Sequence, residues 1–327
     1  MTAFFIMRKI ALIYMGGTFG CVGEPLAPMP ADTFLPLLKT YLPNSLNIHC
    51  FVVPVIQDSS ACTAADWLLL AAQIQNLQQQ NFEHFVVIHG TDTLSYAAAV
   101  LSHLLVNSTH VVLTGSQLPL LNVDATHPHS DSDALDNLLE ALNAVQRLEK
   151  GVYVAFQHKL IHARSALKRH TTELAAFTGL NADTPLTITS KVVDITNELI
   201  AKAAIFNCIS YMLQPISTLQ HLKNLQQFLV NPPHCLILQG FGTANFAVTD
   251  DIIDVLKQFK QQNCMVVLTT QVPFGTVDQR YAVSAWVKNT DILFGNGLGH
   301  ADLYAKALKM YLQYDAVTAW QQHWYDE

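Results

Sequence analysis

The sequence has little charge. Aspartate, glutamate, lysine and arginine together make up 13% of its 327 residues, about half the share found in an average soluble domain. A folded protein with so few charges is expected to cover part of its surface with another subunit. The basic residues are also outnumbered, with 18 Lys and Arg against 25 Asp and Glu. Because nucleic-acid-binding domains are usually basic, we expect no nucleic-acid partner.

Long apolar runs, a basic leader and paired cysteines are also lacking. No run approaches the ~20 apolar residues of a membrane-spanning helix, although half of the residues are hydrophobic. At the start of the chain an apolar patch precedes the basic residues, which is the reverse of a signal peptide. The six cysteines form no CxxC pair and are expected to be free thiols. We therefore predict a cytoplasmic protein with no membrane partner.

What the sequence does contain is a regular alternation of short apolar runs and helical patterns. Apolar runs of this length are typical of strands covered on both faces. The expected helices cover residues 64–80, 95–106, 132–149 and 251–261, and Thr63 with Asp66 forms a capping box for the first. The expected strands are Ile10–Tyr14, Cys50–Ile56, Phe85–His89, Val111–Thr114, Val152–Phe156, Cys235–Gln239 and Met265–Thr269.

This alternation predicts an α/β fold with two domains. The larger would be doubly wound around a mainly parallel sheet, and a smaller α/β domain would follow toward the C-terminus. The pattern weakens in a polar stretch between Thr178 and Lys202 that carries Gly, Asn and Pro. We therefore expect an N-terminal domain over residues 1–190, a linker over 191–203 and a C-terminal domain over 204–327.

Polar segments follow the first strands of the predicted sheet. They read MGGTFG, QDSS, HGTDT and TGSQ, and ligands of open α/β sheets bind at the carboxyl ends of strands. Taken singly, each segment is equally well explained as a tight turn or a helix cap. Their succession at neighbouring strand ends favours a binding site. The G-x-G-x-x-G fingerprint, a phosphate-loop lysine and a G-x-S-x-G elbow are absent.

In this order and at this spacing, MGGTFG, DSS, HGTDTLSYAA and TGSQLP resemble the bacterial-type L-asparaginase family, in particular its cytoplasmic type I branch. The resemblance covers nearly the whole chain. It extends to KRHTTELAAF around Lys168 and to GFGTAN and LTTQVPFG further on. It implies hydrolysis of L-asparagine to L-aspartate and ammonia by a threonine nucleophile, without a metal ion or an organic cofactor. It also implies a homodimer or homotetramer.

The resemblance assigns catalysis to four residues. Thr18 matches the nucleophilic threonine, and Thr91 with Asp92 matches the second threonine and its aspartate. Lys168 matches the lysine ahead of the TT pair. Because a threonine hydroxyl is a weak nucleophile, it needs a base. Lys168 can be that base only in its neutral form, while Asp92 would counter the substrate's ammonium and orient the hydroxyl–lysine chain.

A second group of residues is expected to bind the amino-acid substrate. The serines after the second strand match the segment that holds its α-carboxylate and α-amine. Backbone N–H groups around the second threonine and the TGSQ turn would hold the developing oxyanion. An asparagine in GFGTAN matches one presented by a neighbouring subunit. The expected substrate-binding residues are Asp58, Ser59, Ser60, Ser116 and Asn245.

The loop after the first GGT departs from the family pattern. The family carries a tyrosine there on a mobile lid, whereas this sequence has none between Tyr14 and Tyr41, and Leu26 stands at the corresponding place. We expect residues 20–33 to form the lid. Two alternatives to an asparaginase stay open: an asparaginase-like hydrolase of another amide or an ester, and a non-catalytic homologue that binds an amino acid through Asp92 and the serines.

Overall fold

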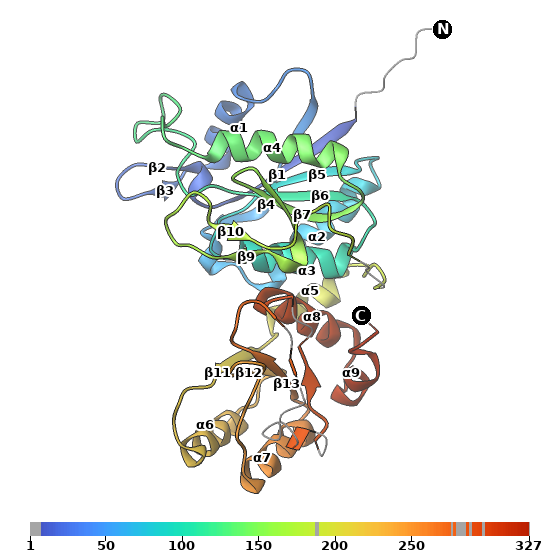
Figure 1. The fold of residues 1–327 in the computed structure, drawn as a ribbon. Coiled ribbons are helices and arrows are strands. Elements are labelled where there is room, and N and C mark those ends of the chain that lie inside the picture. Colours follow the sequence, from blue (N-terminus) through green and yellow to red (C-terminus); the bar gives the residue numbers. More distant parts are fainter. Residues whose placement is uncertain are drawn as a thin grey trace. The chain divides into compact units, whose positions relative to one another are not determined.

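The computed structural model describes residues 8–186, 190–275, 277–278, 286–287, 290–295 and 298–326. The chain divides into two compact units, Met1–Ala204 and Ile205–Glu327, and each is an α/β unit with a mainly parallel sheet (Figure 1). This confirms the predicted fold class. Helix α5 (Asn197–Ala204) begins in the segment expected as a linker and ends one residue beyond it. It packs against α2, so the division falls at the end of this helix.

The sheet of the first unit has six strands in the order β4-β1-β5-β6-β7-β8. All neighbours are parallel except β7 and β8. The chain first places β4 on one side of β1 and then crosses to β5 on the other side. The strand order therefore reverses between β1 and β5, and such a reversal is where open α/β sheets bind their ligands. The strands are β1 (Lys9–Gly16), β4 (Asn47–Gln57), β5 (His84–Ile88), β6 (His110–Thr114), β7 (Gly151–Phe156) and β8 (Lys159–His162).

Helices cover both faces of this sheet (Figure 1). Helices α1 (Ala31–Thr40) and α4 (Ala134–Arg147) pack on the face that carries Ile10, Leu12 and Tyr14. Helices α2 (Ala64–Gln78) and α3 (Leu94–Leu105) pack on the other face. Because successive strand side chains alternate between the faces, every residue from Ile10 to Tyr14 is buried. The continuous apolar runs of the sequence result from this double cover.

Two short antiparallel strand pairs extend the first unit around the sheet. A hairpin of β2 (Cys21–Val22) and β3 (Ala27–Pro28) follows the turn after β1. A second pair, β9 (Leu167–Lys168) and β10 (Phe177–Thr178), is antiparallel and presents Lys168 opposite Phe177.

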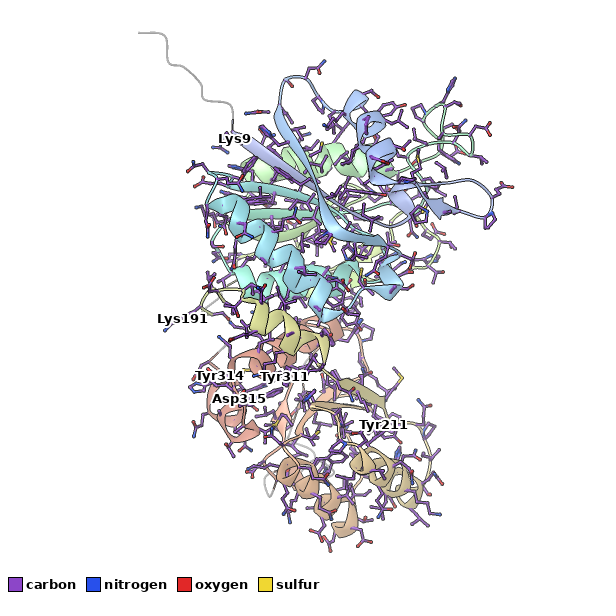
Figure 2. All side chains as sticks on the ribbon, turned by 180° about the vertical axis from the view of Figure 1, so that it is seen from behind. Lys9, Lys191, Tyr211, Tyr311, Tyr314 and Asp315 are labelled. Atoms are coloured by element: carbon purple, nitrogen blue, oxygen red, sulfur yellow. The ribbon has the colours of Figure 1, made fainter. Side chains whose placement is uncertain are left out.

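The second unit has a four-stranded parallel sheet in the simple order β11-β12-β13-β14. Helices α6 (Thr218–Val230) and α7 (Asp250–Gln261) pack on one face, and α8 (His300–Gln313) and α9 (Val317–His323) on the other. Tyr211, labelled in Figure 2, ties β11 to α6: its hydroxyl lies 2.9 Å from His221 Nδ1 and accepts from Asn224 Nδ2 at 2.9 Å. The strands are β11 (Cys208–Met212), β12 (Cys235–Gly240), β13 (Met265–Thr270) and β14 (Leu293–Phe294).

The predicted strands and helices are all present, with boundaries shifted by a few residues. The predicted capping of α2 is confirmed, since Asp66 accepts the Thr63 backbone N–H at 2.7 Å. Strand β11 was missed because it is a half-exposed edge strand whose polar Ser210 and Tyr211 interrupt the apolar pattern. All six cysteines are free thiols, as predicted. In the described ranges, no helix is long and apolar enough to cross a membrane.

Candidate functional site

The loops that follow β1, β4 and β5 touch one another at two glycines. Gly17 has a positive φ of 82°, and a Cβ on it would lie 2.3 Å from the Cα of Gly90. A Cβ on Gly90 would lie 2.5 Å from Ser59 Oγ. Only glycine allows backbones to approach this closely. The glycines of GGT and HGT therefore bring three polar loops together at the point where the strand order reverses.

Lys168 joins two of the predicted catalytic residues. Its Nζ donates to Thr91 Oγ1 at 2.9 Å and forms an ion pair with Asp92 Oδ1 at 2.9 Å. Thr91 is 7% exposed, whereas the side chain of Asp92 is 57% exposed. The hydroxyl, the amine and the carboxylate thus form one connected chain that runs from the buried end of the site toward solvent.

Asp58 organises the loop after β4. Its Oδ1 accepts the backbone N–H of Ser60 at 2.8 Å and the Ser60 hydroxyl at 2.6 Å. These hydrogen bonds, helped by the positive charge of Lys168, hold the pKa of Asp58 below its ordinary value. Thr93 Oγ1 donates to the carbonyl of the buried Ser59 at 2.7 Å and ties this loop to the one after β5. The site therefore contains an ionised carboxylate beside the two serines.

Thr18 begins the short 3₁₀ turn Thr18–Gly20 directly after β1 and is half-buried. The neighbouring Cys21 thiol donates to the carbonyl of Gly17 at 3.3 Å. Burial raises the pKa of this thiol, and the charge of Asp58 raises it further. Cys21 is therefore a protonated thiol that supports the turn.

Ser116 follows β6 and is 1% exposed. Its hydroxyl has no hydrogen-bond partner within the described part of the chain. A buried hydroxyl without a partner is costly unless a ligand or water satisfies it, so Ser116 fits a binding role. Asn245 lies in the second unit, in the loop after β12, where its backbone forms an isolated antiparallel β-bridge with Phe241. Its side-chain Nδ2 lies 3.4 Å from Thr243 Oγ1.

Sequence reasoning missed two residues next to the Thr91–Lys168–Asp92 chain. His89 is 1% exposed and immediately precedes the Gly90–Thr91 turn, and Trp67 of α2 donates its indole N–H to His89 Nε2 at 3.2 Å. The His of HGTDT was visible in the sequence, but nothing in the sequence pairs it with a tryptophan on another element.

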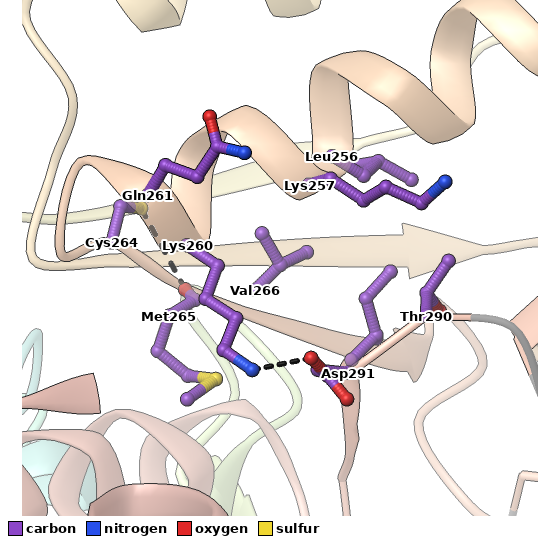
Figure 3. Close-up of a pocket in the computed structure, with 10 residues that line it drawn as sticks. Leu256, Lys257, Lys260, Gln261, Cys264, Met265, Val266, Thr290 and Asp291 are labelled. Atoms are coloured by element: carbon purple, nitrogen blue, oxygen red, sulfur yellow. Dashed lines mark hydrogen bonds and ion pairs between the residues drawn. The ribbon is translucent and has the colours of Figure 1, made fainter. Parts of the chain in front are cut away.

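The second unit contains a cavity of about 240 Å³. It lies between the end of α7 and the beginning of β13, at the amino end of the strands rather than the carboxyl end. An ion pair joins Lys260 to Asp291 at its rim (Figure 3). Its lining residues are Leu256, Lys257, Lys260, Gln261, Cys264, Met265, Val266, Thr290, Asp291 and Ile292. None of the predicted site residues is among them. Across the described ranges, no group of three or more His, Cys, Asp or Glu residues could hold a metal ion.

The candidate site is therefore a threonine–lysine–aspartate chain in a doubly wound α/β unit, in which Thr91 and Asp92 follow a strand at the reversal of strand order and Lys168 comes from β9. A model of the asparaginase family, described as Asparaginase, N-terminal, matches residues 9–201. The chain belongs to the asparaginase family, which confirms the family predicted from its motifs.

The individual relatives have low sequence identity to this chain. The chain is 28% identical over 323 residues to the 60 kDa lysophospholipase of Mus musculus, with 88% of this chain and 56% of that protein covered. It thus spans about half the length of that relative. It is 26% identical over 323 residues to L-asparaginase 1 of Escherichia coli strain K12, with 94% and 91% covered. The thermostable L-asparaginase from Thermococcus kodakarensis has the same fold, with a TM-score of 0.76, 22% identity and 96% of both chains covered.

Proposed function

We propose that this protein hydrolyses the side-chain amide of L-asparagine to give L-aspartate and ammonia. The position of Lys168 carries the proposal, because its Nζ lies 2.9 Å from both Thr91 Oγ1 and Asp92 Oδ1. In this structure the amine donates to Thr91 and pairs with Asp92, so Lys168 would take the proton of a threonine hydroxyl only after giving up one of its own. The carboxylate of Asp92 would keep the amine in place. Membership of the asparaginase family supports an amide as the bond that is cleaved.

The substrate would be held by its charged α-groups. The carboxylates of Asp58 and Asp92 would bind the α-ammonium, and the ionised state of Asp58 supports this role. The hydroxyls of Ser59 and Ser60 would bind the α-carboxylate. Ser116 would use its unpartnered hydroxyl on the side chain of the substrate. Together, these contacts would recognise the α-ammonium, the α-carboxylate and the side chain of the amino acid.

In the proposed reaction, the Thr18 hydroxyl oxygen attacks the side-chain amide carbon. The hydroxyl proton passes through the Thr91–Lys168 chain to the amide nitrogen, the C–N bond breaks and ammonia leaves. Water then attacks the ester formed on Thr18, which releases L-aspartate and restores the hydroxyl. The backbone N–H of Thr91 would stabilise the negative charge that develops on the carbonyl oxygen in both steps. The sum consumes one water molecule for each amide.

The same proposal includes the assembly and the compartment. A homodimer or homotetramer would let Asn245 of one subunit complete the site of another, and the low charge of the chain supports a subunit-covered surface. The proposed location is the cytoplasm, supported by six free cysteines.

The second candidate is hydrolysis of an ester, and it is favoured by the name of the 60 kDa lysophospholipase relative. A threonine nucleophile with an oxyanion site can attack an ester carbonyl as well as an amide carbonyl. The non-catalytic alternative rests on the lid, where Leu26 is 54% exposed between β2 and β3 and supplies no hydroxyl.

The test is ammonia release from L-asparagine by the purified protein in water enriched in ¹⁸O. Hydrolysis predicts stoichiometric ammonia and L-aspartate with one ¹⁸O in its side-chain carboxylate. L-glutamine, D-asparagine and a lysophosphatidylcholine are assayed in parallel. Turnover of the phospholipid without turnover of L-asparagine would replace the proposal with the ester hydrolase. Binding of L-asparagine without any turnover would identify a non-catalytic homologue.

A further inference from the structure

His89 is in contact with the catalytic loop on one side and with helix α2 on the other. Its Nδ1 lies 2.8 Å from the carbonyl oxygen of Gly90, and its Nε2 lies 3.2 Å from Trp67 Nε1. An indole N–H can only donate, so Nε2 must be the accepting, unprotonated nitrogen. The proton of the neutral ring is then on Nδ1, where it donates to Gly90. Trp67 therefore determines the tautomer of His89.

The environment of the ring favours this neutral form. His89 is 1% exposed, and its burial lowers the pKa of the imidazole, although the hydrogen bond to Gly90 opposes the shift. Trp67 is itself 3% exposed and stacks on Tyr96 of α3 with a centroid separation of 6.3 Å. The His89–Trp67 pair is therefore buried and is packed against α3 through Tyr96.

The hydrogen bond to Gly90 determines the direction of the next backbone donor. The Gly90 carbonyl and the Thr91 N–H belong to one planar trans peptide, so they point in opposite directions. Fixing the carbonyl toward the His89 ring aims the Thr91 N–H away from it. Within the described part of the chain, this N–H donates to no other group. A free, oriented backbone N–H beside the catalytic hydroxyl is the arrangement that an oxyanion site requires.

We propose that His89, held by Trp67, is a positioning residue that orients the Thr91 backbone N–H toward the carbonyl oxygen of the substrate. The inference rests on the proposed function, in which that N–H stabilises the oxyanion. His89 itself touches neither the substrate nor the reacting atoms. Its role is to reduce the freedom of one peptide plane, so its loss should lower kcat and leave KM almost unchanged.

Two substitutions at the same position separate this role from a general contribution to folding. His89→Asn places an amide N–H where Nδ1 was, so it can still donate to Gly90 but cannot accept from Trp67. His89→Gln places its amide where Nε2 was, so it can accept from Trp67 but does not reach Gly90. We expect His89→Asn to keep kcat within about threefold and His89→Gln to lose about 30-fold, with KM within threefold in both, because a misdirected donor costs less than the 10²–10³ of a removed one.

Trp67→Phe provides a third variant that keeps an aromatic ring against Tyr96 but removes the indole N–H. We expect a smaller loss of kcat, about threefold to tenfold, because the tautomer is then no longer imposed while the Gly90 contact remains possible. Thermal unfolding is measured for all three variants. Equal kcat losses in His89→Asn and His89→Gln, or a change in KM with kcat unaffected, would overturn the inference.

A binding measurement tests the role of His89 without requiring the protein to turn over a substrate. One side-chain carboxylate oxygen of L-aspartate would occupy the oxyanion position, so its affinity, measured by calorimetry, should be retained in His89→Asn and weakened several-fold in His89→Gln. If the wild-type protein binds L-aspartate but releases no ammonia from L-asparagine, the proposed function fails while this comparison still tests His89. A wild-type protein that does neither overturns both proposals.

Discussion

The two units of this protein are built from the same elements but differ in strand order. In the first unit the order reverses between β1 and β5, whereas in the second the strands follow one another as β11-β12-β13-β14. At a reversal, the loops leave neighbouring strands toward opposite faces of the sheet and open a crevice between them. Thr18 and Thr91 follow the two strands on either side of this reversal. The comparison explains why the candidate catalytic residues Thr18 and Thr91 are in the first unit.

In the second unit, described polar groups at the carboxyl ends of the strands instead form hydrogen bonds with one another. Thr270 Oγ1 donates to the carbonyl of Gly242, and Gln271 Nε2 lies 3.3 Å from the carbonyl oxygens of both Leu213 and Gln239. Apolar side chains at this edge are exposed, including Phe274 at 65%. Similar strand ends thus serve loop structure in one unit and supply the candidate catalytic hydroxyls and carboxylates in the other.

The largest effect should come from Lys168→Met, which keeps the length of the side chain but cannot exchange a proton. We expect kcat to fall about 10³-fold, because the substitution removes the amine between Thr91 and Asp92. Lys159→Met, at an exposed lysine of β8, is the matched control and should keep full activity. The measurement is steady-state ammonia release. Equal activity in the two variants would remove Lys168 from the mechanism.

Thr91→Val should lower kcat about 10²-fold with little change in stability, since valine has nearly the shape of threonine but lacks the hydroxyl. In the second unit, Thr249 caps α7 by accepting the Ile252 N–H. Thr249→Ala should instead cost about 1 kcal/mol of unfolding free energy and leave kcat unchanged. Retention of more than a tenth of wild-type kcat by Thr91→Val would show that the second-threonine role is wrong.

Two glycine substitutions, one in each unit, separate the cost of close loop contact from that of a positive φ. Gly17→Ala should destabilise the protein by about 2 kcal/mol, because the new methyl group meets the Gly90 backbone in addition to the strain of a positive φ. Gly299, at the beginning of α8, also has a positive φ, of 113°. Apart from its chain neighbours, no atom of the described residues lies within 4 Å of an added Cβ. Gly299→Ala should cost only about 1 kcal/mol. Urea unfolding measures both, and equal costs would contradict the contact argument.

The smallest effect concerns the amino ends of β5 and β6 in the sheet of the first unit, at the opposite edge from the candidate site. His84 stacks on His110 with a centroid separation of 4.6 Å, and burial, followed by the charges of His110 and Arg8, lowers the pKa of His84 to about 4. Between pH 6.5 and 4 the unfolded chain therefore binds more protons at this position than the folded chain. Stability should fall as the pH drops through this interval.

The check is the midpoint of thermal unfolding at pH 7.5 and 5.0 in the wild type and in His84→Gln. The decrease should be smaller in the variant, because glutamine does not titrate. An identical decrease in both proteins would show that His84 does not contribute to the pH dependence of stability.

The sequence by itself determined the alternation of strands and helices, the fold class and the family, because these depend on local patterns and short motifs. Apolar runs between polar loops suffice to predict a sheet covered on both faces, as Ile10–Tyr14 illustrates. The motifs also sufficed to select Thr91, Asp92 and Lys168 as candidates for one site. Each of these signals lies within a few consecutive residues.

Only the tertiary structure decided how these candidates meet. Lys168 is 77 residues from Thr91 along the chain, and no local pattern states that a two-residue strand places its amine 2.9 Å from that hydroxyl. The contact of Trp67 with His89 is likewise invisible in the sequence, because it joins a helix to a strand end across 22 residues. Distances between side chains follow from strand order and packing, and these are properties of the whole folded unit.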